Sequence, residues 1–171
     1  MADSKLYLDS LKSMSLALEK MLALEEVKKQ IKAEYERIPK NNGSDSKVML
    51  DALVKVFPII SNLQEQEKLL KSEIAEQISK SLNNALAFIK TYDLKDFEDE
   101  KMSGIEKHFQ ILYDVITSHS VDIDSISIKP NILPQTLEKL DPLRENPMAN
   151  RVIEKIEKIN LLIVSHNVGK E

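Results

Sequence analysis

The feature that most constrains the fold is an apolar stripe repeating every three or four residues across the middle of the chain. It steps by 4, 3, 4, 3, 4, 3 and 4 residues, and Glu67 is its one charged member. The apolar members are Met49, Leu53, Val56, Ile60, Leu63, Leu70 and Ile74. Such spacing places side chains along one side of an α-helix. We predict a long helix, capped within residues 44–46 and reaching about Tyr92, which Pro58 either kinks or splits.

Three further segments have helical spacing. The first extends from about Ser4 to Ile38 and ends before Pro39, because the residue preceding a proline avoids the helical conformation. The second opens at Ser103, which begins a Ser-x-x-Glu capping box, and fades within residues 118–120. The third opens at the Asn146-Pro147 pair, a favourable cap and first helical position.

Residues 121–135 differ from these helices. Apolar residues alternate with polar ones, and Pro130 and Pro134 interrupt any continuous helix. An extended segment is therefore expected, with one helical turn following it at Thr136–Leu140.

Composition supports an all-α fold. The chain has only three glycines among 171 residues, and a many-stranded sheet with tight turns would need more. We predict an elongated bundle or coiled coil of three to four amphipathic helices, with a short extended, proline-flanked segment near 121–135. Residues 1–120 should form a long helical hairpin or bundle, residues 121–146 an extended connector, and residues 147–171 a C-terminal helix packed on the bundle.

Motifs for enzymatic chemistry are missing from the sequence. The glycines lie about 60 residues apart, so neither a P-loop nor a dinucleotide fingerprint can form. Without cysteine there is no thiol nucleophile or thiolate metal site. A Ser–His–Asp triad is recognised by geometry, so sequence leaves it open, but no nucleophile elbow accompanies it. We expect no catalytic residues, no cofactor and no metal.

The three histidines lie beside apolar stripes. Isoleucine stands three positions before His108, His119 and His166, where a di-iron bundle would need glutamate. We therefore interpret them as residues at the edge of a helix seam, with no ligand role.

The central stripe has two interpretations. It can be the core of this chain, packed against its own helices, or a seam between chains. The helices predicted here outgrow a compact bundle of this size, and the overhang would expose apolar surface that monomers normally avoid. We therefore predict an interface between chains at Met49, Leu53, Val56, Ile60, Leu63, Leu70 and Ile74.

Charge marks a second candidate surface. The net charge is −4, but residues 93–126 alone carry nine acidic and three basic side chains. We predict an acidic binding surface formed by Asp93, Asp96, Glu98, Asp99 and Glu100, against the alternative of a solvated linker.

These features favour a non-enzymatic structural or interaction protein, an oligomerising helical subunit or adaptor with protein partners. The alternative is a membrane-surface helical scaffold of the kind BAR-type domains form, although no residue motif of that family occurs here. Nearly balanced charges argue against anionic membranes and nucleic acids as partners. With no signal-peptide core at its start and no apolar run long enough to span a bilayer, we expect an intracellular, cytoplasmic protein, with the nucleus left open.

Overall fold

Every element of the structure is a helix. The structure, a computed structural model, describes residues 2–39, 46–91, 99–118 and 120–168. Within these ranges there is no strand, which confirms the all-α prediction. The α-helices are α1 (Ala2–Glu36), α2 (Ser46–Thr91), α3 (Asp99–Thr117), α4 (Ile132–Leu140) and α5 (Pro147–Val168). Two short 3-10 helices, η2 (Ile123–Ser125) and η3 (Asp141–Leu143), flank α4.

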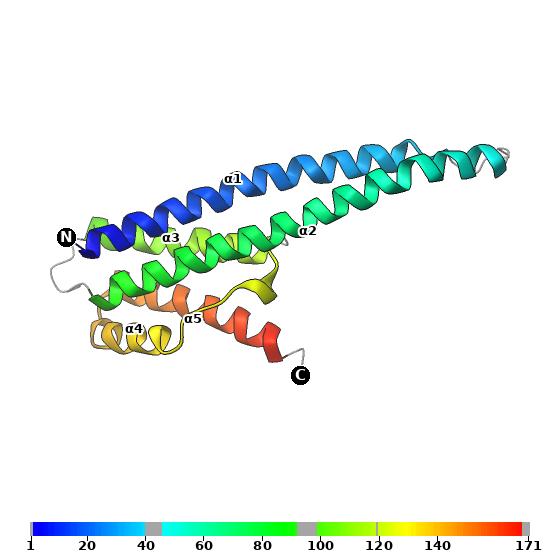
Figure 1. Ribbon diagram of the computed structural model, residues 1–171. Helices are drawn as coiled ribbons and strands as arrows, with labels where there is room; N and C mark the ends of the chain where they lie inside the picture. The colour runs from blue at the N-terminus through cyan, green and yellow to red at the C-terminus, as the bar shows by residue number, and fades with distance from the viewer. Residues whose placement is uncertain (1, 40–45, 92–98, 119, 169–171) are drawn as a thin grey trace.

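Helices α1 and α2 form a long antiparallel hairpin (Figure 1). The shorter helices α3, α4 and α5 gather at the end where α1 begins and α2 finishes. The rest of the hairpin projects beyond them, and α2 reaches further than α1 at the projecting end. With 46 residues, α2 is about 70 Å long at 1.5 Å per residue.

The predicted long helix is confirmed, but Pro58 does not split it. Pro58 lies inside one continuous helix, α2. A proline removes one backbone donor and crowds the preceding turn. The loss of a single hydrogen bond is tolerated here because about three turns of α2 precede Pro58 and about nine follow it.

The start of α3 corrects the sequence prediction. The helix begins at Asp99, so Ser103 lies inside it and does not cap it. Met102 explains the difference, because its side chain is buried in the core and draws the preceding turn into the helix. Burial of Met102 therefore outweighed the local capping signal at Ser103.

Residues 121–135 are more helical than predicted. They contain η2, capped by an Asp122 carboxylate that accepts the Asp124 amide at 3.2 Å. The helix α4 starts at Ile132 rather than Thr136 and includes Pro134. Its first turn accepts a proline because amides there have no helical carbonyl to bond.

The final helix begins where the sequence predicted. The Asn146 side chain accepts the Met148 amide at 3.0 Å, and Pro147 is the first helical residue. The buried stripe of α5 joins one core cluster to which all five helices contribute, with Phe109 of α3 and Leu140 of α4 fully buried in it. The three-part division of the chain stays a prediction.

Candidate interaction surface

Four of the seven predicted seam residues are buried inside this chain. Val56, Ile60, Leu63 and Ile74 are covered, while Met49, Leu53 and Leu70 are half-buried. Helix α1 lies alongside, and the Lys20 ammonium contacts the Glu73 carboxylate at 2.7 Å across the two helices. The structure therefore gives these four residues an intramolecular role. An interface between chains at this seam stays a prediction.

The predicted acidic surface falls largely outside the described residues. Asp93, Asp96 and Glu98 lie in an undescribed range, whereas Asp99 and Glu100 form the first turn of α3. Its binding role stays a prediction.

Polar side chains lie buried where α1, α2 and α3 meet. The Ser10 hydroxyl donates to the Ser81 carbonyl at 2.6 Å, and the Ser81 hydroxyl donates to the Ser10 carbonyl at 2.8 Å. His108 Nε2 lies 2.7 Å from Ser10 Oγ. His108 is thus a core residue, which corrects its assignment to a seam edge.

This cluster is arranged to hold helices together. Both serine hydroxyl protons are already donated to carbonyls, so Nε2 of His108 must be the donor to Ser10 Oγ. His108 Nδ1 then carries an unshared electron pair and has no hydrogen-bond partner among the residues that the structure describes. Burial lowers the pKa of His108 to about 4, so its ring is neutral near pH 7. A nucleophile–base–acid relay would need an acceptor at Nδ1 and access for substrate, and the cluster offers neither.

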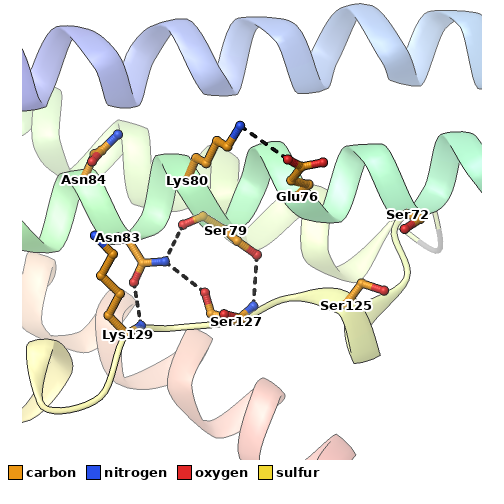
Figure 2. A pocket seen from close by; sticks show the side chains of 9 residues that line it. All are labelled: Ser72, Glu76, Ser79, Lys80, Asn83, Asn84, Ser125, Ser127 and Lys129. Atoms are coloured by element: carbon orange, nitrogen blue, oxygen red, sulfur yellow. Dashed lines mark hydrogen bonds and ion pairs between the residues drawn. The ribbon is translucent and has the colours of Figure 1, made fainter.

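A polar groove of about 400 Å³ lies between α2 and residues 125–129 (Figure 2). The Asn83 amide nitrogen donates to the Ser127 carbonyl at 2.9 Å, and its oxygen accepts the Lys129 amide at 2.8 Å. The Ser79 hydroxyl oxygen accepts the Ser127 amide at 2.9 Å. These groups bind the backbone of the connector at residues 127–129 and hold it against α2.

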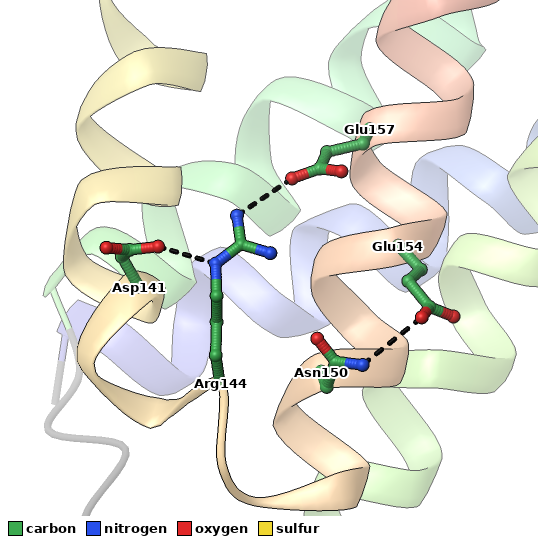
Figure 3. A network of polar contacts seen from close by, with 5 residues as sticks. All are labelled: Asp141, Arg144, Asn150, Glu154 and Glu157. Carbon is green, nitrogen blue, oxygen red and sulfur yellow. Dashed lines mark hydrogen bonds and ion pairs between the residues drawn. The ribbon is translucent and has the colours of Figure 1, made fainter.

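A second polar network lies between the end of η3 and α5 (Figure 3). The Arg144 guanidinium contacts the Asp141 carboxylate and reaches Glu157 at 3.0 Å. It ties η3 to α5 on the surface. Among the described residues, no group of three or more histidine, aspartate or glutamate side chains could hold a metal ion. In the same residues, no helix is long and apolar enough to cross a membrane.

The tip of the hairpin exposes large apolar side chains. Leu50, Val54 and Phe57 of α2 are 60%, 66% and 53% exposed. Their spacing, i, i+4 and i+7, puts them on one side of the helix, away from the buried seam. Five of the fourteen large hydrophobic residues exposed in the described chain lie within residues 48–59, so this is where exposed apolar surface concentrates.

This stripe and the end of α1 belong to one face of the hairpin. Gln64 lies two turns after Phe57 on α2, and its amide donates to the Tyr35 hydroxyl at 3.4 Å. Tyr35 lines a groove of about 970 Å³ together with Lys28, Ile31, Lys32, Glu36, Ile38 and Pro39. We call this the distal face and define it by Lys28, Lys32 and Tyr35 of α1 with Leu50, Val54 and Phe57 of α2.

The same face is covered at the other end of the hairpin. Tyr7, four heptads before Tyr35 on α1, packs edge-to-face against His108 of α3 with ring centroids 6.0 Å apart. Lys71, one heptad after Gln64 on α2, accepts the Asp122 amide at its carbonyl oxygen at 3.3 Å. The bundle therefore lies on this face near residues 7 and 71 and leaves it bare at the tip.

Sequence reasoning found the seam and missed the distal face. A usable signal was present, because ten of the thirteen residues from Val48 to Ile60 are apolar. One seam in a helix needs about half that density, so a second apolar surface was implied.

Comparison with protein-family models, with curated proteins and with solved structures finds no match for this chain.

Proposed function

We propose that this chain is a non-enzymatic interaction protein, a helical adaptor that binds a helical protein partner through its distal face. The observation that carries the proposal is the change in cover along one surface of the hairpin. Near the bundle α3 and residues 121–122 cover it, and at the tip Leu50, Val54 and Phe57 are exposed.

The exposed stripe has the spacing by which helices bind helices. Anchors at i, i+4 and i+7 fit a groove or a second amphipathic helix. These side chains are already partly covered, so burying the exposed remainder would contribute roughly 1–2 kcal/mol each. The bundle, in turn, supplies the base from which the hairpin projects (Figure 1).

Site-specific photocrosslinking tests the proposal. The natural chain has no cysteine, so Val54→Cys carries a single reactive thiol for a crosslinker. Lys55→Cys is the matched control, because Lys55 is also exposed but points to another side of α2. In extract of the native cells, Val54→Cys should give adducts of discrete mass, and Lys55→Cys should not.

The crosslinked protein must then bind in purified form. Once identified by mass spectrometry, it should bind the wild type and lose at least about tenfold in affinity for Leu50→Asp/Phe57→Asp, a change of about 1.4 kcal/mol. Adducts formed equally from both thiols, or unchanged affinity for the double variant, would rule out the distal face as the binding surface.

A further inference from the structure

We infer that the partner presents an amphipathic helix whose apolar stripe is flanked by aspartate and glutamate. This inference rests on the proposed function and adds the chemistry of the partner. Two observations carry it: the continuity of the distal face with the packed bundle, and the charge of the hairpin tip.

The bundle shows which kind of element this face accepts. Helix α3 covers this face of the hairpin near Tyr7 of α1. It ends at Thr117, well before the hairpin does. Its own buried side chains follow the helical spacing Ile105, Phe109, Leu112 and Ile116. A partner helix placed beyond α3 would continue the same layer along the hairpin.

The charge of the tip selects among such helices. The described tip residues, 28–39 and 46–58, carry six basic and three acidic side chains, although the whole chain has a net charge of −4. One of these acids, Glu34, contacts the Arg37 guanidinium at 3.1 Å. At the groove itself, Lys28 and Lys32 stand against Glu36 alone. Acidic residues flanking the partner's apolar stripe would complement Lys28 and Lys32 and would speed the association of the two proteins.

Two synthetic peptides of 21 residues test the inference with the full chain. Both carry the same leucine stripe at helical spacing, flanked by glutamate in one and by lysine in the other. Fluorescence anisotropy of the labelled peptides gives their affinities at low salt and at 0.5 M salt. The glutamate peptide should bind about tenfold more tightly at low salt, and high salt should reduce this difference because exposed charges are screened.

A charge-reversed variant locates the effect. Lys28→Glu/Lys32→Glu should remove the preference for the glutamate peptide. The control, Lys12→Glu/Lys107→Glu, makes the same change in net charge at exposed positions away from the distal face and should keep the preference. Circular dichroism checks that both variants retain the helicity of the wild type.

Several outcomes would overturn the inference. These are equal or tighter binding of the lysine peptide, no binding of either peptide, and equal effects of the two charge-reversed variants. Sedimentation with phosphatidylserine vesicles in place of peptide binding, or a dimer mass in light scattering that Phe57→Asp reduces to a monomer mass, would also overturn it. If Val54→Cys captures a partner and the glutamate peptide still fails to bind, this inference fails while the proposed function stands.

Discussion

The two ends of α2 differ sharply in burial although both are rich in apolar residues. Between Ile74 and Ile89 eleven residues are buried, whereas between Ser46 and Glu73 only Val56, Ile60 and Leu63 are. Helix α1 runs alongside α2 from the bundle to about Gln64, where Tyr35 meets it, and α2 continues past the end of α1. The difference therefore has two causes: α3, α4, α5 and the connector add a second covered side near the bundle, and α1 ends before the tip of α2 does. A heptad seam alone buries a single stripe.

The seam also changes in kind along the hairpin. Near the bundle, small buried residues such as Ser10 and Ala17 of α1 meet α2 closely enough for the Ser10 and Ser81 hydroxyls to bond across the helices. Toward the tip the buried α1 residues are Leu24 and Val27. Close backbone approach and polar bonds thus give way to aliphatic packing.

The largest expected effect is a loss of stability at the covered end. Leu86 is fully buried, so Leu86→Ala should lower the free energy of unfolding by about 2–5 kcal/mol through lost burial and the cavity left behind. Leu50→Ala at the tip should change it by less than about 0.5 kcal/mol. Urea unfolding followed by circular dichroism measures both. Equal losses would mean that the two ends do not differ as described.

Lowering the pH should destabilise the bundle end of the hairpin through His108. Its folded pKa of about 4 lies below the ordinary value of 6.5, so the unfolded chain binds the proton first. Burial of the neutral His108 ring therefore makes the free energy of unfolding depend on pH. This contribution is fully present above pH 6.5 and is lost as pH falls toward 4, for a total of about 3 kcal/mol. Tyr7, Ser10, Ser81 and Phe109 surround the ring, and none of them supplies an anion to hold the imidazolium.

The measurement is the free energy of unfolding from pH 7.5 to 4, compared with His108→Gln. The variant cannot titrate at this position, so its stability should fall less steeply between pH 6.5 and 4. Parallel profiles for the two proteins would show that His108 does not titrate in the buried state described.

A smaller loss of stability is expected where Asn83 holds the connector against α2. Asn83→Ala would leave the Ser127 carbonyl and Lys129 amide without their side-chain partner and should destabilise the chain by about 1–3 kcal/mol. Asn84→Ala, at the rim of the same groove, is the control and should have little effect. Hydrogen exchange at the Lys129 amide should accelerate in Asn83→Ala alone. An unchanged exchange rate would show that another contact orders this segment.

Sequence predicted best the elements whose signals are local and strong. The four heptads of α2 and the Asn146-Pro147 cap gave helix positions that the structure confirms. The starts of α3 and α4 were wrong because Met102 packs in the core and because Pro134 fits a first helical turn. The distal face could not be placed from sequence, because its exposure depends on where α3 ends in space.

The length of the overhang has a mechanical consequence. From Ile74 to the start of α2, about 28 residues project past the densely buried region, a lever of roughly 40 Å. A tilt of about five degrees at the base would displace the tip by roughly 4 Å, about two thirds of a helical turn. Repacking at Ser10, Ser81 and His108, too slight to alter the fold, would therefore reposition Leu50 and Phe57 relative to the bundle. Ser81 lies about two helical turns past Ile74, inside the bundle end that holds this lever.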